Sequence, residues 1–204
     1  MLKALAWLVV FAVAFIRPLF GDTGCAELEG ASLDVHLSYL QRERTSVTSP
    51  CVSKAVYEIA QKGNPENFPR YGDALKSLVS YLDYRLPEEQ SKYLRAVSSN
   101  VDPYPASNAL GMIGRTAVPE IVASIGSSGT TDVARQNGIW TLFIIFVRED
   151  IAMPVRVLKK AAKTADDFET SQRFLRAAQK ASEMCKGPSA LKCRDALYEP
   201  DEQF

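Results

Sequence analysis

The sequence predicts an all-α protein made of stacked antiparallel helix pairs, an architecture called an α-solenoid. Apolar residues recur at helical spacing in one segment after another, and no strand-like alternation extends beyond a few residues. Between Tyr104 and Phe143 the pattern indicates a helix, a tight turn, a second helix, a loop and the start of a third helix. The chain has 204 residues, of which 47% are hydrophobic, enough for one domain with a core.

The N-terminal residues 1–21 are expected to be a secretory signal peptide. Lys3 supplies the positive start, Ala4 to Ile16 form a short uncharged apolar run, and cleavage is expected near the small residue Gly21. The run is shorter than the ~20 apolar residues that a membrane span needs. No Ala-x-Ala site marks the cleavage point, so an uncleaved membrane anchor is the alternative. We therefore expect an exported protein, periplasmic or secreted.

Residues 22–185 are expected to form a single helical domain. Pro50 is expected at the first position of one helix, which Gly63-Asn64-Pro65 ends, and Pro87 opens another. Asp166 or Asp167 should cap the last helix. The apolar stripes, in chain order, are Leu33/Leu37/Leu40, Val52/Ala55/Val56/Ile59, Leu75/Leu78/Val79/Leu82, Tyr93/Leu94/Val97, Ala106/Ala109/Leu110/Ile113, Val118/Ile121/Val122/Ile125, Ile151/Val155/Leu158/Ala162 and Phe168/Leu175/Ala178.

The segment from Val133 to Val147 differs from the other helices because it is apolar almost all round. Such a helix is normally central and buried. We therefore expect it to form the centre of the domain, with Trp140 in the core. It is too short for a membrane helix, and Arg135 and Arg148 bracket it.

Four cysteines follow the predicted signal, and an exported chain meets an oxidising compartment. Of the three possible pairings we favour Cys25–Cys51 with Cys185–Cys193, because one pair lies near each end. Metal binding is an alternative, weakened by the lack of a C-x-x-C motif and by a single histidine, His36. Free buried thiols are the third interpretation.

A resemblance to HEAT-like repeats is carried by residues 104–164. Three motifs carry it: Ala109-Leu110-Gly111-x-Ile113-Gly114, Ala117-Val118-Pro119-x-Ile121 and Asp132-Val133-x-Arg135. Weaker copies are visible over 50–82 and 165–185, whereas 83–103 suggest an extra, irregular helix. The resemblance implies helix pairs stacked into a curved superhelix, with the second helices (70–84, 117–126 and 150–164) lining the concave face. Small residues such as Ala109, Gly111 and Gly138 would let neighbouring helices approach closely. An ordinary helical bundle without repeats is the alternative.

Signals for catalysis are few. A single histidine excludes most catalytic triads and zinc sites built on several histidines. The Gly126-Ser127-Ser128-Gly129 stretch has no base near it in the sequence and is expected to be a loop. Acidic pairs at Glu88/Glu89, Glu149/Asp150 and Asp166/Asp167 precede predicted helices, where cap and dipole roles explain them. No catalytic residue, metal site or cofactor is therefore predicted.

A basic stripe is the strongest candidate for a binding site. Arg156, Lys159, Lys160 and Lys163 follow one another at i, i+3, i+4 and i+7, away from the apolar stripe of their helix. Residues 151–194 carry ten basic and four acidic residues, whereas the extension 186–204 ends in the acidic tail Asp195, Glu199, Asp201 and Glu202. The stripe is either a solvated outer face or a docking surface for an acidic protein or anionic envelope polymer.

The predicted function is that of an exported, non-catalytic helical repeat protein that binds another macromolecule. The chain has 24 basic and 24 acidic residues, which argues against nucleic acid as the partner. Two alternatives are open. One is an enzyme-associated module, because short HEAT-like repeats also occur in bilin lyases. The other is a carrier of an apolar small molecule in a groove around Trp140 and Phe143.

Overall fold

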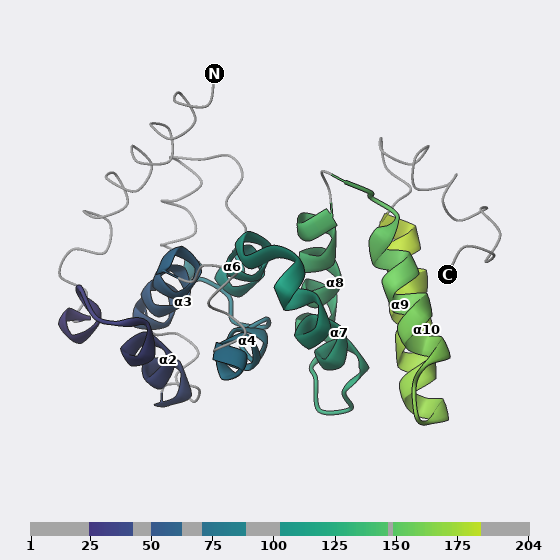
Figure 1. The fold of residues 1–204 in the computed structure, drawn as a ribbon, viewed down its shortest axis with the longest axis horizontal. Coiled ribbons are helices and arrows are strands. Elements are labelled where there is room, and N and C mark those ends of the chain that lie inside the picture. Colours follow the sequence, from purple (N-terminus) through teal and green to yellow (C-terminus); the bar gives the residue numbers. More distant parts are fainter. Residues whose placement is uncertain (1–24, 43–49, 63–70, 89–102, 147–148, 185–204) are drawn as a thin grey trace, which may run out of the picture.

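The computed structural model describes residues 25–42, 50–62, 71–88, 103–146 and 149–184. Over these residues the protein is all helical, as predicted, with the helices packed against one another (Figure 1). In chain order the elements are η2 (Ala26–Leu28), α2 (Leu33–Arg42), α3 (Pro50–Lys62), α4 (Gly72–Val79), α6 (Pro105–Ile113), η5 (Gly114–Ala117), α7 (Val118–Gly126), α8 (Asp132–Phe146), α9 (Met153–Lys163) and α10 (Phe168–Met184). The predicted signal peptide, most of the helix opened by Pro87, and the acidic tail lie outside the described residues.

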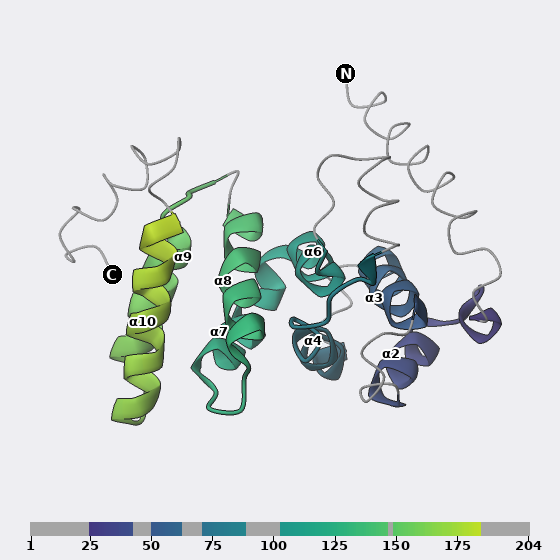
Figure 2. The same cartoon turned by 180° about the vertical axis from the view of Figure 1, so that it is seen from behind.

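The helices form two rows, which are seen from opposite sides in Figures 1 and 2. Along one row α3 packs against α6, α6 against α8, and α8 against α10. In the other, α4 contacts α7, and α9 follows beyond it (Figure 1). Between the rows, α7 packs against α8 and α9 against α10 as antiparallel pairs. As a result α7 and α9 run in the same direction, opposite to α8 and α10 (Figure 1).

Most of the predicted apolar stripes are buried. Val52, Ala55, Val56 and Ile59 are fully inaccessible, and the stripes of α4 and α6 are at most 8% exposed. Burial of these side chains is the main favourable contribution to folding, since a buried aliphatic side chain contributes roughly 1.5–3 kcal/mol. The expected first position of Pro50 is also confirmed, because Pro50 begins α3, and Pro119 lies in the first turn of α7.

Two glycines permit close contacts between helices, as predicted for Gly111 and Gly138. A Cβ on Gly111 would lie 2.5 Å from Cγ2 of Ile144, so α6 approaches α8 through a site where only hydrogen fits. A Cβ on Gly138 would lie 3.1 Å from Cγ1 of Ile125, at the contact between α8 and α7. The contacts of α8 with α6 and with α7 therefore each depend on a glycine.

The prediction that α8 is buried on every side is wrong. Trp140 is 46% exposed and Val133 is 45% exposed, while Phe143 is 8% exposed. The neighbours α6, α7, α9 and α10 cover the remaining sides of α8. The side that carries Val133, Gln136 and Trp140 stays open to solvent. A helix in one row of a two-row stack has one outer face, whatever residues that face carries.

Two residues of the last predicted stripe are likewise not buried. Phe168 is 77% exposed and Leu175 is 45% exposed, whereas Ala178 is 4% exposed. The buried side of α10 is instead formed by Phe174, Ala177, Ala178 and Ala181. Helix α10 stands at the end of its row, so no further described helix covers its outer side (Figure 1).

The disulfide Cys25–Cys51 is confirmed, with the two Cα atoms 5.5 Å apart and a sequence separation of 26. It ties the segment before α2 to the first turn of α3. The other predicted pair, Cys185–Cys193, lies outside the described residues. Within the described part, no helix is both long and apolar enough to cross a bilayer.

Candidate functional site

The candidate site is a surface that we call the α7–α9 face. Val118 and Val122 lie one turn apart on α7, and Met153, Val157 and Ala161 are spaced by four residues along α9. All five side chains are partly buried and pack on the edge of the core, so they are covered on one side and open on the other. Because α7 and α9 run in the same direction, these two rows of apolar side chains are aligned with each other (Figure 1).

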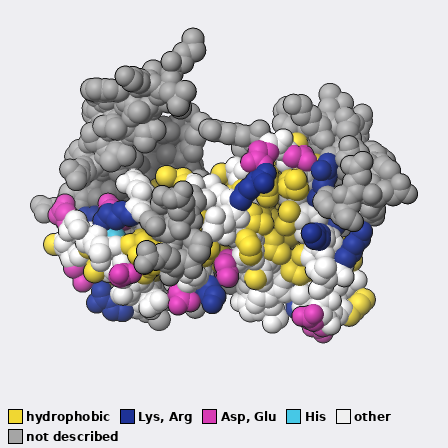
Figure 3. Space-filling model, in the orientation of Figure 1, with side chains coloured by type: hydrophobic (Ala, Val, Ile, Leu, Met, Phe, Trp, Pro, Cys, Tyr) yellow, Lys and Arg dark blue, Asp and Glu magenta, His cyan; other side chains and the backbone are white. Residues whose placement is uncertain are grey.

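The upper end of this face is hollowed into a shallow, open depression of about 340 Å³. Val118 and Pro119 of α7, Phe146 of α8 and Met153 of α9 line it, together with Arg115. Figure 3 shows hydrophobic side chains gathered over this part of the molecule, with Lys and Arg side chains on either side. Proline has no backbone N–H, so Pro119 adds apolar surface without an unsatisfied donor.

Arg115 borders the depression on the α7 side. Its guanidinium forms an ion pair with Glu149 and lies 5.8 Å from the centre of the Phe146 ring. Two thirds of the side chain, 66%, is exposed. The ion pair is therefore accessible to water, where such pairs contribute little to stability. An acidic group of a partner could replace Glu149 at Arg115 at small cost.

The four residues of the predicted basic stripe all lie on α9, but in different surroundings. Lys159, Lys160 and Lys163 are exposed. Arg156 is only 26% exposed and pairs with Asp150 at 3.0 Å, so it also holds the turn before α9. Helical spacing places Lys160 on the open side of α9 next to Val157, whereas Lys159 lies on the flank toward α10. The stripe therefore borders the α7–α9 face on one side, opposite Arg115.

The sequence interpretation missed the apolar part of this site. The sequence pattern places Val118 and Val122 in the buried stripe of α7, and the row Met153/Val157/Ala161 is less evident than the main apolar stripe of α9. The signal was present, since Met153, Val157 and Ala161 recur at i, i+4 and i+8. A second apolar row at helical spacing, adjacent to the first, widens the apolar side of α9 beyond what burial in one core requires.

Two arginines hold the C-terminal end of α7, and the sequence interpretation did not assign them this role. Arg135 of α8 donates hydrogen bonds to the carbonyl oxygens of Ile125, Ser127 and Thr130 at 3.0 to 3.1 Å. Arg173 of α10 donates to the carbonyl of Gly126. The carbonyls of Ile125 and Gly126 lie in the last turn of α7 and have no partners within that helix, and those of Ser127 and Thr130 lie in the loop that follows. A positive charge at a helix C-terminus is favourable. Arg173 therefore belongs to the framework of the site.

Of the acidic residues expected to cap helices, Asp167 caps α10 as predicted, whereas Asp150 bonds the turn before α9, whose N-cap residue is Ala152. Asp167 accepts the backbone N–H of Thr170 at 2.7 Å, and Asp150 accepts that of Ala152 at 2.9 Å. Hydrogen bonds from Thr170 hold the pKa of the Asp167 carboxyl below its usual value. Both carboxylates are thus engaged with the backbone and not arranged as an acid–base pair.

His36 is fully buried between α2 and α3. The ammonium group of Lys62 lies 3.3 Å from Nε2 of the ring and also donates to the carbonyl of Ala31. Burial, followed by the charge of Lys62, lowers the pKa of His36. The imidazole is therefore a neutral packing residue that accepts a hydrogen bond from Lys62. Among the described residues, no group of three or more His, Cys, Asp and Glu side chains could hold a metal ion.

Comparisons of the chain with protein families, with curated proteins and with solved structures found no match. The resemblance to HEAT-like repeats therefore rests on the residues quoted above and stays a prediction.

Proposed function

We propose that this chain is an exported, non-catalytic HEAT-like repeat protein that binds another macromolecule on the α7–α9 face. The observation that carries the proposal is the partly open apolar surface formed by α7 and α9, bordered by Arg115 and Lys160. Apolar patches with a polar rim are typical of protein interaction sites. The Cys25–Cys51 disulfide is compatible with an oxidising, extracytoplasmic setting.

The chemistry of the face favours an acidic protein over an anionic polymer as the partner. A polymer held by charge alone needs a row of cations, which Lys159, Lys160 and Lys163 could supply. The apolar rows of α7 and α9 gain free energy only when apolar groups of a partner remove them from water, at about 25 cal/mol per Å². A protein segment with apolar and acidic side chains would use both features, and nucleic acid would leave the apolar rows uncovered.

The proposal is tested by recovering partners of the mature protein from envelope extract with three forms of the chain. One is the unchanged protein. The second carries Ala123→Glu and Lys160→Glu, which alter two exposed positions of α7 and α9 at the face. The third carries Lys180→Glu, a charge reversal on α10 next to Gln136, on the opposite row.

We expect a protein captured by the unchanged chain and by the Lys180→Glu variant to be lost with the double variant. All three proteins should unfold at similar temperatures, because exposed substitutions change stability by no more than about 0.5 kcal/mol. Recovery of the same partner by all three forms would show that binding occurs elsewhere.

A further inference from the structure

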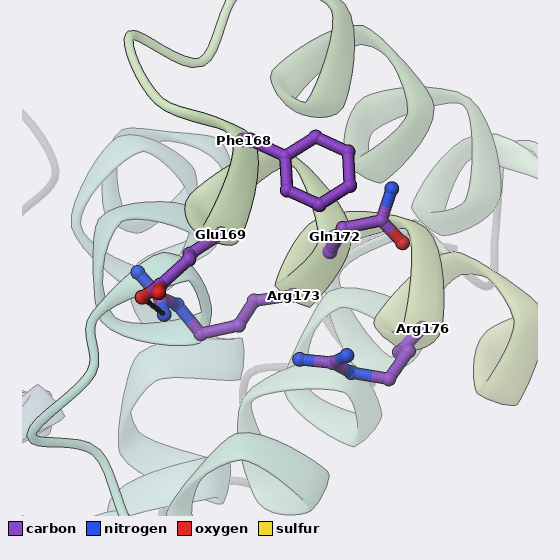
Figure 4. A pocket seen from close by; sticks show the side chains of 5 residues that line it. All are labelled: Phe168, Glu169, Gln172, Arg173 and Arg176. Atoms are coloured by element: carbon purple, nitrogen blue, oxygen red, sulfur yellow. Dashed lines mark ion pairs between the residues drawn. The ribbon is translucent and has the colours of Figure 1, made fainter.

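A second exposed surface lies on the outer side of α10, at the end of the stack. Phe168, Gln172 and Arg176 are spaced by four residues along this side, and their side chains follow one another in Figure 4. Together with Glu169 and Arg173 they line a depression of about 200 Å³. We call this surface, with the adjacent Leu175, the α10 end face.

Two apolar side chains of this face are exposed close to each other. Phe168 is 77% exposed, and Leu175, seven residues later on the same side, is 45% exposed. The last unit of a stacked helical array normally presents a polar outer face or is covered, because its apolar side has no following unit. The α10 end face exposes Phe168 and Leu175 among its polar side chains, and no described helix covers them.

The charged groups at this face favour an acidic occupant. Glu169 is already paired with Arg173 at 3.7 Å, so its charge is compensated. Arg176 is exposed and forms no ion pair among the described residues. The bond between Ser171 Oγ and the Ala162 carbonyl sets the antiparallel register of α9 and α10, which puts Leu175 at the level of Leu158 and Lys159. The exposed Lys159 therefore adds a second cation beside Leu175.

The chain itself continues from the end of α10 with a segment of matching chemistry. Residues 195–204 carry four acidic residues and no basic residue, together with the apolar side chains of Leu197, Tyr198 and Phe204. This is the composition expected of a ligand for a surface that combines Phe168 and Leu175 with Arg176 and Lys159.

The segment is also long enough to reach the face. Helix α10 has 17 residues and is about 25 Å long, so Phe168 and Met184 lie at opposite ends of it. Twenty residues follow Met184 and could extend by about 66 Å. If Cys185 and Cys193 pair, residues 194–204 still span about 36 Å, which exceeds the length of α10.

We propose that the acidic C-terminal segment 195–204 folds back on the α10 end face and caps the stack. Its apolar side chains cover Phe168 and Leu175, and its carboxylates pair with Arg176 and Lys159. The α7–α9 face lies on the other side of α9 from this cap.

The test is amide hydrogen exchange of segment 195–204 in the full-length mature protein, at labelling times from milliseconds to seconds. We expect exchange at least about tenfold slower than in the free peptide of the same sequence, because a docked backbone exchanges only when it opens. Arg176→Glu and, separately, Phe168→Ser should restore exchange close to the rate of the free peptide. Lys76→Glu, the same kind of charge reversal at an exposed position of α4, is the matched control and should leave the protection unchanged.

Three results would overturn the proposal. The first is exchange of the segment in the unchanged protein at the rate of the free peptide. The second is protection that survives both Arg176→Glu and Phe168→Ser. The third is protection that disappears on dilution, which would assign the contact to a second copy of the chain. All the substituted side chains are exposed, so the fold should persist, and the circular dichroism of each variant checks this.

Discussion

Replacing Gly126 by alanine should destabilise the protein by forcing α10 away from the end of α7. A Cβ on Gly126 would lie 2.4 Å from Cζ of Phe174 and 3.0 Å from both neighbouring ring carbons. Phe174 is 6% exposed and belongs to the core, so its ring has little free space to move into. Overpacking of this kind typically costs about 1–3 kcal/mol. Alanine recovers part of this cost because it is favoured over glycine in a helix by about 1 kcal/mol.

The net expectation for Gly126→Ala is therefore a loss of up to about 2 kcal/mol in the free energy of unfolding. Urea unfolding of the oxidised protein, followed by circular dichroism, measures it. Gly72→Ala is the matched control, because Gly72 also lies in a helix but has nothing within 4 Å of its Cβ position. This control should unfold at the same urea concentration as the parent or at a higher one.

A second variant separates the clash from other effects of the added methyl group. Phe174→Leu shortens the side chain that the new Cβ would meet, so the double variant should lose less stability than the sum of the two single changes. Residues in contact commonly show such coupling energies, of about 0.5–3 kcal/mol. If Gly126→Ala is more stable than the parent, or if the two changes are strictly additive, the packing of Phe174 on Gly126 is not as described.

Three further predictions concern the disulfide, the histidine and the basic stripe. Reducing Cys25–Cys51, which closes a loop of 26 residues, should lower the free energy of unfolding by about 3.5 kcal/mol; a urea midpoint unaffected by reductant would contradict this. The lowered pKa of His36 means that the unfolded chain takes up the proton first, so stability should fall as the pH drops below about 6.5. His36→Gln should flatten that dependence in urea titrations between about pH 8 and pH 5, and an equally steep dependence in the variant would exclude His36 as its source. Reversing both Lys159 and Lys160 to Glu should slow association with an acidic partner, and the difference from the parent should shrink as salt shortens the reach of charge to about 8 Å. Equal association rates at low salt would leave these lysines as solubilising residues.

The positions of the helices could be predicted from the sequence because most of them bury one narrow stripe against their neighbours. The stripe of α3 and the close contacts at Gly111 and Gly138 follow from spacing and residue size alone. For α8 this reasoning failed, because a segment that is apolar all round gives no indication of which side faces solvent. The exposure of Trp140 is set by the number of neighbours around α8, which is a property of the whole stack.

The candidate site could be predicted only in part for a related reason. Charges at helical spacing indicated that Lys159 and Lys160 are exposed, and they are. The apolar rows beside them have no distinctive sequence signature, because the sequence does not distinguish a partly exposed valine from a buried one. Arg173 stabilises the end of α7 through the carbonyl of Gly126, which lies 47 residues earlier in the chain. No local sequence pattern indicates a contact over that separation.

The capping of α7 by later arginines has a consequence for the order in which the chain can acquire its structure. Arg135 and Arg173 come from α8 and α10, so the last carbonyls of α7 find all their donors only after residue 173 has left the ribosome. Until then the end of α7 must be hydrated and is prone to fray. The half of the domain from α7 to α10 should therefore be completed in one late step, while the disulfide of the first half can already form once Cys51 has emerged.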